Sequence, residues 1–427
     1  MINTTSMNNL YVLIILLAIW NCKSNTHSPI TVSGKAYFVA TNGNDNNPGT
    51  FEEPWKTWQK AFLMTGAGDT VYIRGGTYYA NTSDSYGVYL SGKNGKPNEP
   101  VCIFNYPGEK PVLDCSPITT VKNNIGLFLN NCSYFHLRGL TVTGVSQHNM
   151  NNEANGIGIR GGSNHILEQC ISHNNEGPGF WIVGVDSIKV IQCDAYDNFD
   201  RSTADYSGGQ ADGFVFAFAS QSSYTYVKEC RSWFNSDDGF DTWENEGIVV
   251  FDACWAFNNG RGDGDGGGFK LGQTSLPPMQ KPQRILKNCM AFYNKYIGYN
   301  QNNGNVEMIF YNNIAYMNDD SGYSIAQYNN KIVTRNNITH KNKVRDYFKK
   351  ENNDHNSWNP STNVTVTDSD FISTDTTGVS GSRLSDGKLP ETRFLKLSNN
   401  SDLIDAGVDV GLPFTGNAPD LGPFYTY

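Results

Sequence analysis

The stretch CISHNN (170–175) is the first of seven segments in which Cys or Asn is followed by Asn five positions later. The other six are CDAYDN (193–198), CRSWFN (230–235), CWAFNN (254–259), CMAFYN (289–294), NIAYMN (313–318) and NITHKN (337–342). Four of the six steps between them are 23 or 24 residues long, and the other two are 37 and 35. A period of this size indicates a solenoid with one structural unit per repeat.

The sequence before each segment is typical of a short β-strand. Runs such as HILEQC (165–170), SIKVIQC (187–193) and YTYVKEC (224–230) are rich in β-branched and aromatic residues and end in polar turns. Helical repeats would carry long apolar runs of 3.6-residue period, which this chain lacks. We therefore predict an all-β fold, a right-handed parallel β-helix (solenoid) with coils about 5 Å apart. The repeated asparagines would form an internal ladder, each side chain bonded to the next coil.

The cysteines do not require disulfide bonds. Five of the nine lie at the first position of the repeat, and asparagine takes the same position at Asn313 and Asn337. Sulfur is therefore not essential there, and we expect small buried thiols stacked on one another.

The two ends of the chain differ from the repeats. LYVLIILLAIW (10–20) is too short to span a membrane and suits a signal segment, here 1–22, with Cys22 as the lipidation site of a bacterial lipoprotein. We expect an exported protein, lipid-anchored at the cell surface or secreted. Residues 23–34 would be a linker before a single catalytic domain, 35–427. That domain would have an N-terminal cap (35–80) with a short helix around 58–64, and a C-terminal tail (344–427). Capped ends favour a monomer.

Charge is concentrated beside two insertions, 199–212 and 260–267. A glycine followed by Phe or Tyr comes after each of the first six segments, and aligning the coils on it stacks Asp212 on Asp238 and Asp241 on Lys270. Asp237 adjoins Asp238, so four carboxylates converge. Because unpaired carboxylates repel one another, this pattern favours a Ca²⁺ site over a solvated acidic turn. Net charge is −9, which excludes nucleic acid as a favoured partner and means that an acidic substrate needs a local cation.

A lysine beside a Ca²⁺ site suits one reaction in particular. If a uronic acid binds, the metal neutralises its carboxylate, a neutral Lys270 takes the C5 proton, and the oxygen on C4 departs by β-elimination. The competing interpretation is a plain ion pair between Lys270 and Asp241.

At this point the residues resemble a known family. NSDDGFDTW (235–243), CWAFNNG (254–260) and GGGFKLG (266–272) resemble the active-site coils of polysaccharide lyase family 9, the β-helix pectate lyases and their rhamnogalacturonan-cleaving relatives. The tail FLKLSNNSDLIDAGVDVG (394–411) is similar to that family's C-terminal segment. The resemblance implies a lyase of pectic polysaccharide. It also implies the following roles: Ca²⁺ ligands at Asp212, Asp237, Asp238 and Asp241, and the Brønsted base at Lys270.

Two other functions stay open. A β-helix glycoside hydrolase of the polygalacturonase type would use two of the aspartates as acid and base, but its Gly-His-Gly and Arg-x-Lys motifs are absent. A surface glycan-binding protein would leave the Asp and Lys cluster unexplained.

Trp243, Arg201 and Arg261 are candidate substrate contacts. For Trp181 and Trp233, packing between coils is the favoured interpretation.

Overall fold

The computed structural model describes residues 34–149, 152–201, 207–272, 281–327, 331–423. The expected signal segment with Cys22, and the linker up to residue 33, lie outside the described residues. Among the described residues no helix is long and apolar enough to cross a membrane.

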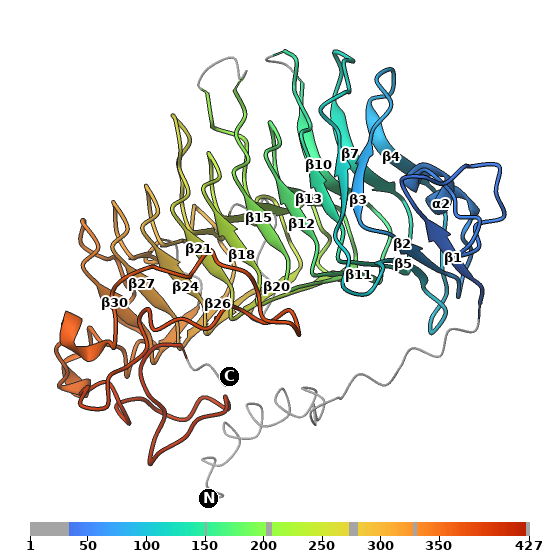
Figure 1. Cartoon of the computed structure of the whole chain (residues 1–427). Helices are drawn as coiled ribbons and strands as arrows, with labels where there is room; N and C mark the ends of the chain where they lie inside the picture. Colours follow the sequence, from blue (N-terminus) through green and yellow to red (C-terminus); the bar gives the residue numbers. More distant parts are fainter. Residues whose placement is uncertain (1–33, 150–151, 202–206, 273–280, 328–330, 424–427) are drawn as a thin grey trace, which may run out of the picture.

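The described strands form three sheets in which every neighbouring pair is parallel, and from β2 to β28 each turn of the chain adds one strand to each sheet (Figure 1). This is the predicted parallel β-helix. The eleven-stranded sheet consists of β1 Ala36–Val39, β2 Thr70–Ile73, β5 Val101–Asn105, β8 Phe135–Arg138, β11 His165–Glu168, β14 Ser187–Ile191, β17 Tyr224–Lys228, β20 Ile248–Asp252, β23 Arg284–Lys287, β26 Met308–Tyr311 and β29 Ile332–Arg335.

The other two sheets complete each coil. The ten-stranded sheet consists of β3 Gly76–Tyr79, β6 Pro111–Asp114, β9 Thr141–Thr143, β12 Ile171–His173, β15 Asp194–Tyr196, β18 Arg231–Trp233, β21 Trp255–Phe257, β24 Met290–Phe292, β27 Ile314–Tyr316 and β30 Ile338–His340. The nine-stranded sheet consists of β4 Tyr86–Ser91, β7 Asn124–Asn130, β10 Ala154–Arg160, β13 Phe180–Val183, β16 Phe214–Ala217, β19 Phe240–Asp241, β22 Phe269–Lys270, β25 Tyr299–Asn300 and β28 Tyr323–Ser324.

The asparagine ladder is present and buried. In every step from Asn175 to Asn342 the side-chain amide donates to the next Oδ1, at 2.9 to 3.1 Å. Each ladder residue follows one in the left-handed conformation, and these include Phe234, Tyr293 and Met317. A second ladder runs through Asn313, Asn337 and Asn356, where asparagine replaces cysteine. All eight cysteines in the described part are buried and free, as expected.

Stacked aromatic rings form the core beneath the nine-stranded sheet. They are the residues that follow the repeated glycine, with neighbouring ring centroids 4.5 to 5.1 Å apart: Phe180, Phe214, Phe240, Phe269, Tyr299 and Tyr323. Such stacking gives a rigid base for the side chains that alternate with these rings on the outer face.

The ends of the solenoid are closed by non-repeating segments. The predicted helix is α2 Trp58–Met64, which buries Trp58, Ala61 and Phe62 against the first coils. At the far end Trp358 packs on Tyr323. The tail, with 3₁₀ turns η1 Pro360–Thr362 and η2 Asp368–Asp370, packs on the outside of the ten-stranded sheet, where it covers apolar rings (red in Figure 1).

Candidate active site

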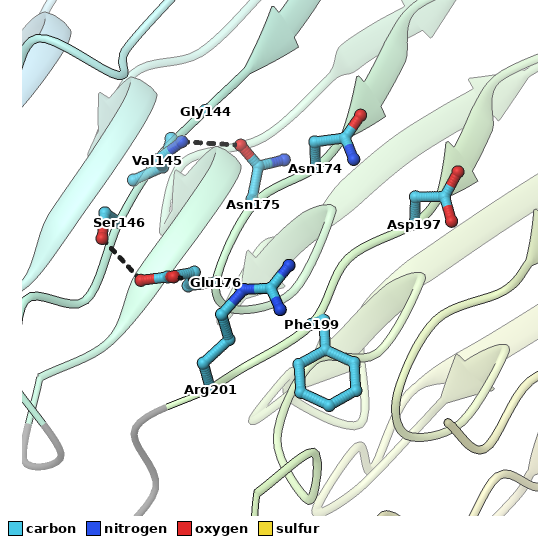
Figure 2. A pocket seen from close by; sticks show the side chains of 9 residues that line it. All are labelled: Gly144, Val145, Ser146, Asn174, Asn175, Glu176, Asp197, Phe199 and Arg201. Carbon is cyan, nitrogen blue, oxygen red and sulfur yellow. Dashed lines mark hydrogen bonds and ion pairs between the residues drawn. The ribbon is translucent and has the colours of Figure 1, made fainter. Parts of the chain in front are cut away.

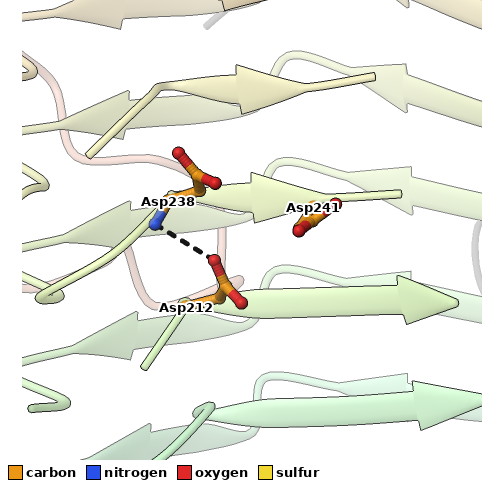
Figure 3. Close-up of side chains that lie close together, drawn as sticks. All are labelled: Asp212, Asp238 and Asp241. Carbon is orange, nitrogen blue, oxygen red and sulfur yellow. Dashed lines mark hydrogen bonds between the residues drawn. The ribbon is translucent and has the colours of Figure 1, made fainter. Parts of the chain in front are cut away.

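Three buried carboxylates meet around β16 and β19, two neighbouring strands in the middle of the nine-stranded sheet. Asp212 and Asp238 lie two residues before β16 and β19, and Asp241 ends β19 (Figure 3). One ligand oxygen from each lies within 4.8 Å of the others, an arrangement that could hold a metal ion. The stacking predicted for Asp212 and Asp238 is seen in a hydrogen bond from the Asp238 amide to Asp212 Oδ1 at 3.0 Å.

Lys270 lies beside this group on the neighbouring strand, since Asp241 and Lys270 are register partners in β19 and β22. Its Nζ is 2.9 Å from Asp238 Oδ2 and 3.3 Å from Asp241 Oδ2. Burial lowers the pKa of Lys270, but the charges of Asp238 and Asp241 outweigh it and raise that pKa above its usual range. In this structure Lys270 is therefore an ion-pair partner of Asp238 and Asp241.

Burial and mutual repulsion disfavour the charged form of these carboxylates. Burial, and then the charges of Asp237 and Asp241, hold the pKa of Asp212 well above its usual range. Burial and neighbouring carboxylates raise the pKa of Asp241 to about 6, against the opposing charge of Lys270. One lysine thus does not compensate three buried carboxylates.

Asp237 points differently from the other three. Its Oδ1 accepts the amide of Asp265 at 2.9 Å, within the insertion 260–267. Burial and the adjacent charge of Asp238 raise its pKa to about 8. The same insertion donates the Gly267 amide to Asp238 Oδ1 at 2.6 Å. A Cβ on Gly267 would lie 2.7 Å from that oxygen, so the close approach requires glycine.

The predicted sugar contacts fall into two places. Trp243 follows the acidic group directly, donates its amide to Asp241 Oδ1 at 2.7 Å and is 42% exposed, with its ring against Phe218. Trp233 is buried between Tyr196 and Phe257, which confirms packing for that residue.

Arg201 and Arg261 lie near each other, over the ring of Phe199, at 5.2 and 5.5 Å. Their carboxylate partners among the described residues are Glu176 and Asp197, not the site aspartates. Arg201, Glu176 and Phe199 line a pocket of about 180 Å³. Figure 2 shows how these side chains lie.

Arg284 is a buried residue that sequence reasoning missed. Its guanidinium donates to Thr242 Oγ1 and to the carbonyls of Gly247 and Leu271. Those contacts join the turn that carries Trp243 to the residue after Lys270. Burial lowers its pKa to about 9, although Asp241 opposes the change. Arg284 is a basic residue at the start of a strand, and nothing in the sequence distinguishes it as a buried one.

Comparison with known proteins identifies the family. The family model described as "Pel9A-like, right handed beta helix region" matches residues 37–353. The chain is 31% identical over 420 residues to pectate lyase L of Dickeya dadantii (strain 3937), covering 95% of this chain and 93% of that protein.

Solved structures agree with this match. The crystal structure of pectate lyase Pel9A is 30% identical with a TM-score of 0.76, covering 92% of this chain and 97% of that one. A rhamnogalacturonan lyase is 26% identical with a TM-score of 0.72, covering 86% and 97%. The chain therefore belongs to the Pel9A-like family of right-handed β-helix proteins, polysaccharide lyase family 9.

Proposed function

We propose that the protein is a Ca²⁺-dependent lyase that cleaves the galacturonate-containing backbone of a pectic polysaccharide by β-elimination. The observation that carries this proposal is Lys270 on the strand next to three buried, converging carboxylates. Family membership supports it, because relatives similar to the chain over most of its length include pectate lyases.

The residues fit a hard divalent cation. Asp212, Asp238 and Asp241 offer only oxygen donors, as Ca²⁺ prefers, and Asp237 is the fourth proposed ligand. Asp238 Oδ2 is buried and accepts no hydrogen bond; its contact is the ion pair with Lys270. When bound, the metal would offset the charge of the substrate carboxylate and make the C5 proton more acidic.

Lys270 would then act as the base. Asp238 and Asp241, which raise the pKa of Lys270 in the absence of metal, would hold the ammonium less strongly if they shared a cation, and the neutral amine would then be accessible. Its nitrogen takes the C5 proton, the C5–H electrons form the C4–C5 double bond, and the C4–O bond breaks. The departing oxygen takes a proton from water. Arg284 holds Leu271, the residue after Lys270, to the turn that carries Trp243 during this step.

The sugar contacts complete the proposal. Trp243 offers an exposed ring next to Asp241 for stacking on a sugar. Arg201 and Arg261 are proposed to bind uronate carboxylates beside the insertions. Export, with residues 1–22 as a signal segment and Cys22 as a possible anchor, remains our proposal for where the protein meets such a polymer.

Two polymers are candidate substrates within this proposal. Similarity to Pel9A favours homogalacturonan, and similarity to a rhamnogalacturonan lyase makes rhamnogalacturonan I the second candidate. The test is the ultraviolet absorbance of the unsaturated uronate end when protein acts on each polymer, with Ca²⁺ and with chelator. We expect a rise on galacturonan that chelator abolishes. New reducing ends without that absorbance would mean hydrolysis and would refute the proposal.

A further inference from the structure

An aromatic cluster lies in line with the candidate active site on the outer face of the nine-stranded sheet. The strand register fixes one row of outward positions along the solenoid axis. From the N-terminal edge this row is Tyr89, Phe128, Gly158, Trp181, Val215, Asp241 and Lys270. The neighbouring positions Leu129, Ile159 and Ile182 belong to the core, so the row faces outward.

The rings in this row are in contact with one another. Tyr89 stacks on Tyr86 at 4.9 Å and lies 5.7 Å from Phe128, whose centroid is 6.3 Å from Trp181. Gly158 makes the last contact possible, since a Cβ there would meet the Phe128 ring at 3.2 Å. Tyr89 is 37% exposed, and Tyr86 and Trp181 are half-buried. Trp181 thus packs between coils, as expected, but also contributes to an accessible surface.

A cation accompanies the rings. Arg160 ends β10, pairs in register with Val183 of the Trp181 strand, and is exposed. Within the described ranges no carboxylate lies within ion-pair distance of its guanidinium. An aromatic face beside an unpaired guanidinium suits a uronate ring, which offers a C–H face for stacking and a carboxylate for a bidentate pair.

The distances suit a long polymer. With strands about 4.8 Å apart, Trp181 lies about 14 Å and Tyr89 about 29 Å from the strand of Lys270. We infer that Tyr89, Phe128, Trp181 and Arg160 form a distal binding site for galacturonate units of the chain being cleaved at Lys270. The identity of that ligand rests on the proposed function.

The test measures binding without cleavage. Protein carrying Lys270→Ala is titrated calorimetrically with a long galacturonate oligomer and with a dimer, which is too short to contact both Lys270 and Trp181. Adding Trp181→Ala, Tyr89→Ala or Arg160→Gln should weaken binding of the long oligomer about tenfold, the loss expected for one ring contact or ion pair, and that of the dimer much less. The effect of Arg160→Gln should shrink at high salt.

Matched controls remove residues of the same kind from other faces. Tyr79→Ala, on the ten-stranded sheet, and Arg393→Gln, in the tail, should leave both affinities unchanged. Long-oligomer binding that is equal in the parent and in all three variants would overturn the distal site, even if lyase activity is found. Absence of unsaturated product from the wild-type protein would instead refute the proposed function, and the titration would still decide whether these residues bind uronate.

Discussion

Replacing Asn235 by alanine tests how the ladder supports the acidic cluster, which begins two residues later. The Asn235 amide donates to Ala195 O, Ser232 Oγ and Asn259 Oδ1, at 3.2, 2.9 and 3.1 Å. Its Oδ1 accepts from both the backbone and the side-chain nitrogen of Asn198. The substitution therefore removes five contacts at a fully buried position.

The magnitude follows from these contacts. The Asn235 side-chain amide has two N–H groups, whose hydrogen bonds contribute about 1 kcal/mol each. The buried amide of Asn198, left without its acceptor, costs about 2 kcal/mol more, which gives roughly 4 kcal/mol of unfolding free energy. Asn342 is the matched control, because it ends the ladder and is only half-buried. Asn342→Ala also removes the acceptor of the Asn318 amide, but at this half-buried end water can replace it, so the cost should be only about 1 kcal/mol.

Thermal unfolding of the two variants, with a Ca²⁺ titration of each, measures the difference. Asn235→Ala should lower the unfolding temperature several times more than Asn342→Ala and should weaken Ca²⁺ binding, since the Asp237–Asp238 turn loses its anchor. Equal unfolding temperatures would refute the view that the internal amides stabilise the coils, and unchanged Ca²⁺ affinity would separate the ladder from the site.

Three further predictions concern other parts of the fold. Burial lowers the pKa of His165 from 6.5 to about 4, so the free energy of unfolding should fall by about 3 kcal/mol as the pH drops from 6.5 to 4. Denaturant unfolding at several pH values should show this loss, and His165→Gln should make the loss smaller. Arg383 in the tail forms an ion pair with Asp194. Arg383→Ala should therefore lower the unfolding free energy by about 2 kcal/mol and expose the tail to protease, whereas Arg393→Ala should do neither. Arg284→Lys should lower the unfolding free energy by about 3 kcal/mol, because one ammonium cannot serve Thr242, Gly247 and Leu271 together; an unfolding midpoint equal to wild type would contradict this.

Periodicity explains why much of this structure could be predicted. A repeat fixes which residues stack, so the ladder from Asn175 to Asn342 and the pair Asp241–Lys270 follow from counting alone. The helix at Trp58–Met64 lies in the N-terminal cap, where the sequence predicts it, outside the repeat.

What the repeat does not determine are side-chain directions and non-repeating contacts. Asp237 and Asp238 are adjacent in sequence. Asp237 nevertheless accepts a hydrogen bond from the Asp265 amide, whereas Asp238 forms an ion pair with Lys270. Left-handed backbone occurs at Phe234 and Tyr293, where side-chain type gives no hint of it, because the coil geometry imposes the conformation. Arg284 binds carbonyls that only the folded turn presents.

The most direct test of the central claim is the turnover of galacturonan by Lys270→Met, measured as unsaturated product at saturating Ca²⁺ alongside a Ca²⁺-binding isotherm. If Lys270 is the base, turnover should fall by at least about 10³-fold while Ca²⁺ still binds, since the carboxylates remain and lose a competing ammonium. Turnover within a few-fold of wild type, with Ca²⁺ bound, would contradict the proposed mechanism.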